Sequence, residues 1–427
     1  MAFENLKEWN VWWTRENFDE LSGIDRDKTS ELFRLISSRH IKILAGIRRS
    51  GKSTILYQII KKLIQSGVQP KNILFLNMED EALLEADFDK LVSIYLENIA
   101  PEGDIYLFID EIQNRERWEF WVKTQYDLKK FKQIFISGSS SSLLLSKHAS
   151  LLTGRQFSFL VYPLSFSEFL KFKKIDYDIN LITKEQKAKI KALLKEYIAY
   201  GGFPEAVLEK EKHRILVEYY SSIIERDIVV KYGLDEKKVK DLCRYLISNI
   251  SSPHSYKKLA SLAGLSPTTV ISYLSHIEES YLFSQLLAFS YKIKDQLQYP
   301  RKVYCHDTGL VNSIAFQFGP NITKLYENLA FLELKRRGNE IFYWRSFQHE
   351  EVDFVVKEGL KIKQLIQVCY NLNEADTKKR ELKSLFKAGK ELKCNNALII
   401  TEDKEGKETL QGMKIEYIPL WKWLLRG

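Results

Sequence analysis

The 427-residue sequence predicts an α/β protein whose N-terminal domain contains a parallel sheet. Three apolar runs carry this prediction, because buried parallel strands have nearly continuous hydrophobic sequences. They are residues 41–45, 105–109 and 133–136. After the first run, hydrophobic side chains recur at helical spacing in Leu56, Ile59, Ile60 and Leu63. A strand, a loop and a helix are therefore expected in succession near the start of the chain.

Composition places the chain among ordinary globular proteins, with 45% hydrophobic and 28% charged residues. No apolar run approaches the roughly 18 residues that a membrane span requires, and the N-terminus lacks a signal-peptide pattern. We therefore expect a cytoplasmic protein of roughly two to four domains. The four cysteines form no CxxC pair, which argues against a disulfide framework or a zinc knuckle. The net charge of +9 weakly favours a polyanionic partner.

The loop after the first apolar run, residues 46–53, has the GxxxxGK[ST] pattern of a P-loop. Gly46 and Gly51 allow backbone N–H groups to turn toward phosphates at the positive end of the next helix. Lys52 is expected to contact the β and γ phosphates of ATP, and Ser53 to ligate Mg²⁺. The predicted nucleotide-binding residues are Gly46, Ile47, Arg48, Arg49, Ser50, Gly51, Lys52, Ser53 and Thr54.

The second apolar run ends in two carboxylates, Asp110 and Glu111. Asp110 is expected to hold Mg²⁺, and Glu111 to orient and deprotonate the attacking water, as a hydrolase requires and a metabolic kinase does not. The alternative is an acidic pair that caps the next helix. The third run ends in a serine-rich turn, where Ser137, or alternatively Ser139, would sense the γ-phosphate.

Further segments complete a pattern that resembles a known family. They are residues 9–13, 152–155, 162–169 and 200–205. Together with the P-loop, they resemble archaeal and bacterial AAA-superfamily ATPases with a C-terminal region of unknown function related to restriction-endonuclease folds. The resemblance extends over essentially the whole chain.

This resemblance implies an AAA-type domain over residues 1–165, a helical lid over 166–234 and assembly into a homo-oligomer. In such ATPases an arginine of a neighbouring subunit often completes the active site, and Arg155 is the candidate here. Arg226 in the lid is a candidate second sensor, while either arginine can be an ordinary surface ion pair. The tryptophans within residues 9–13 are expected to line the adenine site or, more commonly for tryptophan, to pack in the core.

The middle segment, residues 235–295, has short helices with a tight turn and resembles a winged helix-turn-helix. One helix spans 255–263, and Ser266-Pro267 supplies the cap and first turn of the next. In DNA-binding versions this second helix enters the major groove. The candidate DNA contacts are Lys257, Lys258, Thr268 and Thr269. Because the helix lacks arginine, DNA binding without sequence specificity is expected, and a protein-packing module is the alternative.

Residues 296–427 follow the order of a PD-(D/E)xK nuclease core. A helix over 321–337 precedes strands at 340–345, 351–356 and 364–370, a helix at 375–390 and a strand at 397–401. The candidate residues of a vestigial nuclease site are Glu327, Asp353 and Gln367. Cys369 stands where the catalytic lysine is expected, and neither Lys363 nor Lys378 replaces it. We therefore expect the fold without efficient cleavage, with an edge-strand aspartate facing water as the alternative for Asp353.

Together these features predict an ATP-hydrolysing, DNA-associated AAA-family ATPase that uses Mg²⁺. It would remodel or move on DNA, recognising DNA structure rather than sequence, in repair, recombination or defence. One alternative is a nucleotide-controlled switch that binds a protein partner. Another is an ATP-dependent nuclease.

Overall fold

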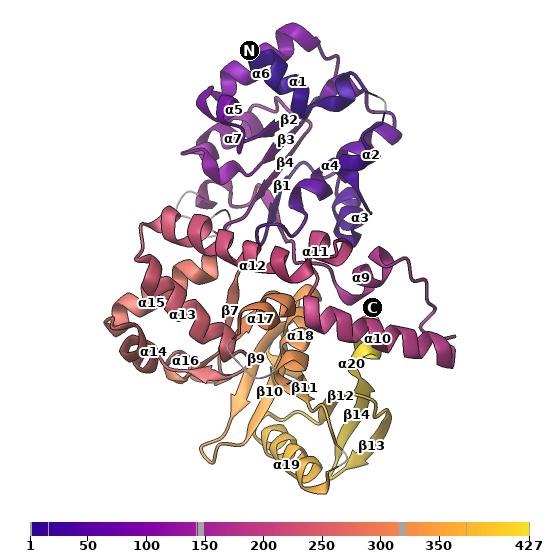
Figure 1. The fold of residues 1–427 in the computed structure, drawn as a ribbon, viewed down its shortest axis with the longest axis vertical. Coiled ribbons are helices and arrows are strands. Elements are labelled where there is room, and N and C mark those ends of the chain that lie inside the picture. The colour runs from indigo at the N-terminus through magenta and orange to yellow at the C-terminus, as the bar shows by residue number, and fades with distance from the viewer. Residues whose placement is uncertain are drawn as a thin grey trace. The chain divides into compact units, whose positions relative to one another are not determined.

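The computed structural model describes residues 2–15, 17–141, 143, 149–315, 322–372 and 374–426. The chain forms two compact units (Figure 1). Unit 1 comprises residues 1–162 and 279–281, and unit 2 comprises residues 163–278 and 282–427. None of the described helices is long and apolar enough to cross a membrane.

Unit 1 contains a five-stranded parallel sheet in the order β2-β3-β4-β1-β5. Its strands are β1 (Ile41–Ala45), β2 (Ile73–Asn77), β3 (Tyr106–Asp110), β4 (Gln133–Gly138) and β5 (Gln156–Leu160). The three predicted apolar runs form β1, β3 and β4, whose side chains are almost all buried. Because β4 lies between β1 and β3, the carboxyl ends of these three strands meet at one edge.

Helices cover both faces of this sheet. Alternate strand residues point to opposite faces, so Ile43 and Leu44 of β1 belong to different core clusters. The long helices of unit 1 are α4 (Lys52–Gln65), α6 (Phe88–Ile99) and α7 (Trp118–Asp127). The short elements are α1 (Ala2–Trp9), η1 (Val11–Trp13), α2 (Asp19–Ser22), α3 (Asp27–Arg34), η2 (Pro70–Asn72), α5 (Glu81–Glu85), η3 (Ile112–Asn114) and η4 (Ala149–Leu152).

The N-terminal tryptophans pack against the edge strand β2. The indole nitrogens of Trp12 and Trp13 both donate to the carbonyl of Ile73, at 3.2 and 2.9 Å. Trp9 Nε1 donates to Asp80 Oδ2 at 2.8 Å. Of the two roles considered for these residues, the contacts fit core packing.

Unit 2 begins with a run of helices. They are α9 (Phe166–Phe172), α10 (Lys184–Tyr200), α11 (Pro204–Leu208), α12 (Lys212–Ser222), the π-helical η5 (Ile223–Val230), α13 (Glu236–Ser248), α14 (Tyr256–Ala263) and α15 (Pro267–Glu279). The turn between α10 and α11 needs glycine, because a Cβ on Gly202 would lie 2.5 Å from the Leu164 carbonyl oxygen. The amide of Gly202 donates to the buried Asp307 at 2.7 Å. The glycine pair at 201–202 is therefore explained by packing within unit 2.

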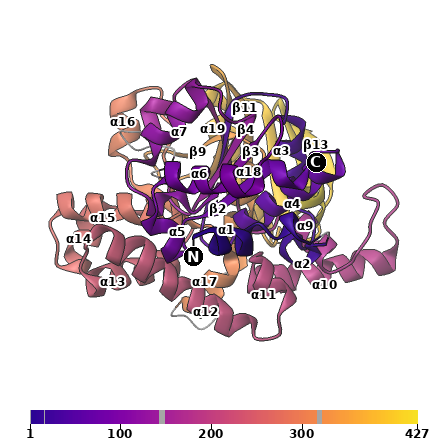
Figure 2. The same ribbon diagram turned by 90° about the horizontal axis from the view of Figure 1, so that it is seen from above.

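Helices α13, α14 and α15 lie side by side in both ribbon views (Figures 1 and 2). As predicted, Ser266 caps α15, since its hydroxyl accepts a hydrogen bond from the Thr269 amide at 3.1 Å. Ser255 caps α14 in the same way, by accepting from the Lys258 amide. A three-stranded antiparallel sheet of β6 (Pro253–His254), β8 (Arg301–Cys305) and β7 (Phe283–Leu286) belongs to the same region. Because β8 pairs with both other strands, the predicted boundary at residue 295 cuts through this sheet.

The C-terminal part of unit 2 has a six-stranded sheet in the order β13-β14-β12-β11-β10-β9. Its strands are β9 (Glu340–Arg345), β10 (Glu351–Glu358), β11 (Lys361–Val368), β12 (Asn396–Thr401), β13 (Gly406–Leu410) and β14 (Met413–Pro419). The accompanying helices are α16 (Ile293–Gln298), α17 (Thr308–Ile314), α18 (Ile322–Arg336), α19 (Ala375–Leu392) and α20 (Leu420–Leu425). The order of α18, β9, β10, β11, α19 and β12 follows the prediction, whereas β13, β14 and α20 were not predicted.

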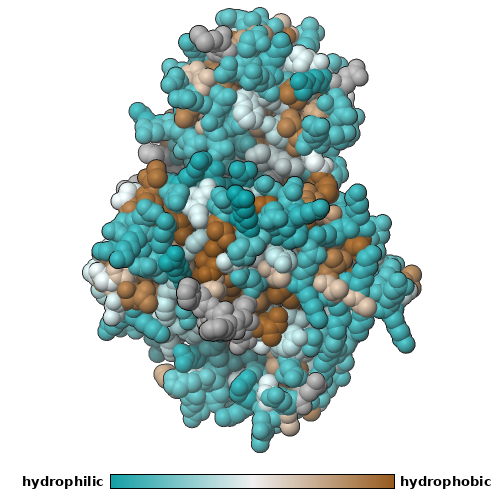
Figure 3. All heavy atoms as spheres, viewed as in Figure 1, coloured by the Kyte–Doolittle hydropathy of each residue, from teal (hydrophilic) through white to brown (hydrophobic). Residues whose placement is uncertain are grey.

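In the space-filling view, hydrophobic residues form separate patches on a mainly hydrophilic surface (Figure 3).

Candidate functional site

The loop between β1 and α4 has a backbone that requires both of its glycines. Gly46 has φ +156°, and a Cβ there would lie 2.1 Å from the carbonyl oxygen of Val161. Gly51 has φ +95° and occupies the left-handed cap of α4. The hydroxyl of Ser50 is buried and has no hydrogen-bond partner among the described residues. A buried orphan hydroxyl beside a helix N-terminus suits an anionic ligand such as a phosphate.

Arg26, which the sequence analysis did not identify, braces this loop. Its guanidinium donates to the Ser50 carbonyl at 2.7 Å and to the Tyr162 carbonyl at 3.0 Å. The backbone amide of Arg26 in turn donates a hydrogen bond to Gln58 Oε1 at 3.1 Å. Arg26 lies 20 residues before the motif with no recognisable spacing, so its role becomes visible only in the fold.

The two predicted carboxylates lie where β3 ends, facing Ser137 of the neighbouring strand β4. The Ser137 hydroxyl donates to Asp110 Oδ1, and the Glu111 amide donates to Ser137 Oγ at 3.4 Å. Ser139, the alternative sensor, instead accepts from Gln113 Nε2 at 3.2 Å. Glu111 precedes η3 but makes no side-chain cap there, so the helix-capping alternative is not what the geometry supports.

Lys52 and Glu111 face each other across the loop. Lys52 Nζ lies 3.4 Å from Glu111 Oε1 and 3.4 Å from the Ile47 carbonyl oxygen. The other oxygen of Glu111 accepts from Gln113 Nε2 at 2.5 Å. Lys52, Glu111, Ser137 and Asp110 thus form one buried cluster.

The environments of the two carboxylates pull their pKa values apart. Burial, and then the charge of Glu111, raise the pKa of Asp110 to about 6, although hydrogen bonds from Ser137 and Ser53 oppose the shift. Burial also opposes ionisation of Glu111, but Lys52 and Gln113 outweigh it and hold the pKa of Glu111 below its usual value. Glu111 is therefore anionic at neutral pH, as a general base must be.

The donor set fits a magnesium nucleotide. Ser53 and Asp110 offer the hard oxygen ligands that Mg²⁺ prefers, and Lys52 supplies the cation for phosphate. Among the other loop residues, Ile47 is buried, Arg49 is exposed and Arg48 pairs with Glu79 at 2.8 Å.

Of the two candidate arginines, Arg155 belongs to the same unit as this cluster but lies away from it. Arg155 pairs with Asp127 at 3.0 Å, and its carbonyl accepts from the Ile41 amide at the amino end of β1. Strand rise places that end roughly 16 Å from the P-loop, so Arg155 does not serve the site of its own chain. Arg226 is an exposed residue of η5 in unit 2, and its role stays a prediction.

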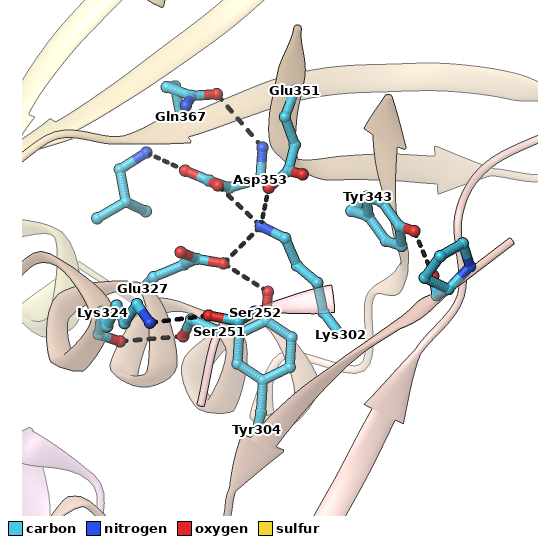
Figure 4. A network of polar contacts seen from close by, with 12 residues as sticks. Ser251, Ser252, Lys302, Tyr304, Lys324, Glu327, Tyr343, Glu351, Asp353 and Gln367 are labelled. Atoms are coloured by element: carbon cyan, nitrogen blue, oxygen red, sulfur yellow. Dashed lines mark hydrogen bonds and ion pairs between the residues drawn. The ribbon is translucent and has the colours of Figure 1, made fainter. Parts of the chain in front are cut away.

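In unit 2 the structure brings together the three residues predicted as a vestigial nuclease site (Figure 4). Asp353 lies on the interior strand β10 and is buried, so the alternative of a water-facing edge residue is wrong. Gln367 Oε1 accepts from the Asp353 amide at 3.3 Å. Glu327 joins them through Lys302, whose ammonium contacts Glu327 at 2.8 Å and Asp353 at 3.1 Å.

Lys302 was missed because it comes from β8, about 50 residues before Asp353 in the chain. The lysines considered from sequence lie elsewhere, since Lys363 pairs with Glu358 and Lys378 with Glu408. Burial opposes the charge of Lys302, but the surrounding carboxylates raise its pKa well above the usual value. The ammonium therefore stays charged.

The candidate DNA-contact residues are accessible. Lys257, Lys258 and Thr268 are exposed, and Thr269 is half-buried beside Ser266 at the start of α15. Lys258 Nζ also lies 5.6 Å from the centre of the Tyr245 ring. These positions agree with a surface that a partner can reach.

Comparisons with known proteins match three successive regions of the chain. Residues 38–170 match the family described as AAA domain, residues 191–320 match a domain of unknown function (DUF8612), and residues 323–423 match another (DUF4143). The chain thus contains an AAA domain, consistent with the parallel sheet and P-loop of unit 1.

Whole-chain relatives are also found. The uncharacterized protein MJ1544 of Methanocaldococcus jannaschii is 38% identical over 90% of this chain and 88% of its own length. An uncharacterized protein of Haemophilus influenzae is 30% identical over 92% of this chain and 96% of its own length.

Among solved structures, Cdc6p of Pyrobaculum aerophilum has 12% identity and a TM-score of 0.31, covering 72% of this chain and 98% of that one. AMPPCP-bound DnaA of Aquifex aeolicus has 16% identity and a TM-score of 0.27, and the match covers 59% of this chain and 86% of that one. Likenesses this weak have no bearing on function.

Proposed function

This chain belongs to the same family as the uncharacterized M. jannaschii and H. influenzae proteins, and we propose that it is an AAA-family ATPase that hydrolyses ATP. The observation that carries the proposal is the pairing of Glu111 with Lys52 at 3.4 Å, beside Asp110. An anionic glutamate next to a metal-binding aspartate and the P-loop lysine would provide a base for water beside the γ-phosphate of a bound nucleotide.

The residues act in distinct ways in this proposal. The loop amides and Lys52 hold the phosphates, while Ser53 and Asp110 bind Mg²⁺. A metal ion held by these two residues would neutralise charge on the transferred phosphate. Glu111 leaves Lys52 when nucleotide arrives, and its carboxylate then orients and deprotonates the attacking water. Ser137, whose hydroxyl donates to Asp110, would sense the γ-phosphate.

The test separates binding from turnover. Glu111→Gln should bind ATP with wild-type affinity and lose about 10²–10⁴-fold in turnover, because only the base is lost. Lys52→Ala should instead weaken ATP binding, because the phosphates lose their nearest cation. Phosphate release and nucleotide titration measure the two effects.

Glu116→Gln is the matched control, since Glu116 is an exposed acid of the same region and should keep full activity. Wild-type turnover in Glu111→Gln would refute the assignment of the base.

We further propose that the ATPase acts on DNA. The net charge of +9 supports this, as do the exposed lysines of α14 in a helical region with a small antiparallel sheet that resembles a winged helix. Because the outer face of α15 carries Thr268, Ser272 and Ser275 but no arginine, backbone contacts should dominate over base contacts. ATP turnover that DNA does not stimulate would favour a switch that binds a protein partner.

The C-terminal module is proposed to share the nuclease-like core without cleaving. The order of α18, β9, β10 and β11 supports the nuclease-like fold. The Asp353–Gln367 contact supports the proposed location of the vestigial nuclease site. Cys369 cannot supply a positive charge, and its thiol donates to the Asn371 carbonyl at 3.3 Å.

A further inference from the structure

The buried ammonium of Lys302 contacts three acidic side chains, two of them buried and one, Glu351, partly exposed. We term these four residues the Lys302 cluster (Figure 4). Its ammonium lies 2.8 Å from Glu327 Oε1, 2.6 Å from Glu351 Oε1 and 3.1 Å from Asp353 Oδ1. β8 supplies the lysine, α18 supplies Glu327, and β10 supplies the other two acids. The side chain of Lys302 is 1% exposed, so these carboxylates, and not water, balance its charge.

The acids of the Lys302 cluster are fixed by further hydrogen bonds. The Tyr304 hydroxyl donates to Glu327 Oε1 at 2.7 Å. The Val368 amide donates to Asp353 Oδ2 at 2.9 Å, and the Asp353 amide donates to Gln367 at 3.3 Å. The carboxylates of Glu327 and Asp353 are therefore held in place around the ammonium by hydrogen bonds from backbone and side-chain groups.

The distances around the Lys302 nitrogen suit an ammonium. Values of 2.6–3.1 Å are lengths of charge-assisted hydrogen bonds. Oxygen ligands approach Mg²⁺ to about 2.0–2.1 Å and Ca²⁺ to about 2.3–2.6 Å. A divalent ion at this position would require the lysine to leave and the acids to close in.

We propose that Lys302 is a built-in cation, whose ammonium takes the place of a divalent metal ion and assembles this acidic centre without metal. The acids then serve as ligands of the lysine, joining β8 and its sheet to α18 and β10. The proposal deepens that of a non-cleaving C-terminal module and is independent of ATP hydrolysis in unit 1. ATPase assays on the same variants keep the two apart.

The first experiment needs no change at Lys302. Nucleotide-free full-length wild type and Asp353→Asn are titrated with Mn²⁺, and the bound ion is counted by electron paramagnetic resonance. Equal Mn²⁺ binding by the two proteins is expected, because the ammonium already fills the cluster. A wild-type Mn²⁺ site that Asp353→Asn abolishes would overturn the proposal.

The second experiment removes the built-in cation. Lys302→Met should bind one more Mn²⁺ than wild type, since three carboxylates then lack a counter-ion, and its melting temperature should rise with Mn²⁺ by mass action. Adding Asp353→Asn should abolish both gains. Lys324→Met is the matched control, because Lys324 bonds the nearby Ser252 at 2.8 Å rather than a carboxylate, and it should gain no site.

A folded Lys302→Met protein without the extra Mn²⁺ site would contradict the proposal. If this variant does not fold even with Mn²⁺, the comparison of wild type with Asp353→Asn decides by itself. DNA cleavage gives a further readout: linear, circular and branched DNA should stay intact with wild type in Mg²⁺ or Mn²⁺. Metal-dependent cutting that Asp353→Ala abolishes would also overturn the built-in cation.

Discussion

Two adjacent carboxylates of unit 1 have opposite electrostatic environments. Asp110 is buried against the charge of Glu111, which raises the pKa of Asp110 to about 6. Glu111 is equally buried, but Lys52 at 3.4 Å keeps its pKa below the usual value. Such a division of pKa values assigns different roles to neighbouring acids. We therefore expect protonation of Asp110 to set the acid limit of the proposed ATPase activity.

We predict that the apparent affinity for Mg²⁺ falls as the pH drops through about 6. A raised pKa means that Asp110 takes up a proton below about pH 6, and a protonated carboxyl does not bind the metal ion. The Mg²⁺ concentration for half-maximal ATPase rate should rise about tenfold per pH unit below 6 and stay constant above 7. The rate is measured from pH 5 to 8 at several Mg²⁺ concentrations.

Excess Mg²⁺ provides the internal control. It should restore the rate at pH 5.5, because metal and proton compete for Asp110, whereas it cannot reverse protonation of the base or unfolding. A Mg²⁺ requirement that does not change between pH 5 and 7 would rule out Asp110 as the titrating ligand.

At the scale of elements, local sequence located the strands that lead into the P-loop, the acidic pair and the serine-rich turn, but it missed the equally buried β2. The apolar runs gave β1, β3 and β4, and Ser255 marked the start of α14. β13 was missed because its residues, Gly406–Leu410, are polar and largely exposed. Such a strand is defined by its pairing with β14 rather than by its own pattern.

The contrast between local sequence pattern and tertiary contact also explains which site residues could be predicted from the sequence. The P-loop and its acids are contiguous motifs, so residue types and spacing located them. Arg26 and Lys302 reach their partners from distant elements, and no spacing in the sequence links them to Ser50 or Asp353. Side chains whose role depends on tertiary packing cannot be found from one sequence alone.

For the α14 region, DNA binding should be modest in affinity, nearly independent of sequence and steeply dependent on salt. Replacing Lys257 and Lys258 together by glutamine removes about two phosphate contacts. The slope of log K against log salt should flatten by roughly one to two units. Fluorescence anisotropy with a labelled duplex, at several salt concentrations, measures this slope.

The matched control for this experiment replaces Lys361 and Lys363, two exposed lysines at the start of β11, by glutamine. It makes the same charge change away from α14 and should leave the slope unaltered. If both double variants flatten the slope equally, general charge rather than the α14 surface binds DNA. An affinity that does not respond to salt would favour a protein partner instead.

At the scale of the whole molecule, one question is whether a single chain holds a complete active site. Unit 1 holds the proposed base, metal ligand and phosphate-binding lysine, but Arg155 lies at the far end of β1 and is paired with Asp127. If Arg155 contributes to catalysis, it must do so for another copy of the chain. If it does not, it forms a surface ion pair that contributes little to stability.

We predict that Arg155 acts in trans, so that Arg155→Ala loses about 10³-fold or more in turnover, the effect of removing an arginine finger. Asp127→Ala is the matched control, because it breaks the ion pair and leaves the arginine, and it should stay active.

Arg155→Ala subunits mixed with Glu111→Gln subunits should then recover activity that neither has alone. In a ring of head-to-tail contacts with random mixing, about one interface in four joins an intact base to an intact arginine, so recovery should approach a quarter of the wild-type rate. A double variant carrying both changes, mixed with either single variant, should recover nothing, because no such interface forms. Absence of recovery in mixtures whose co-assembly is proven by a pull-down through a tag on one subunit would show that Arg155 serves no neighbouring site.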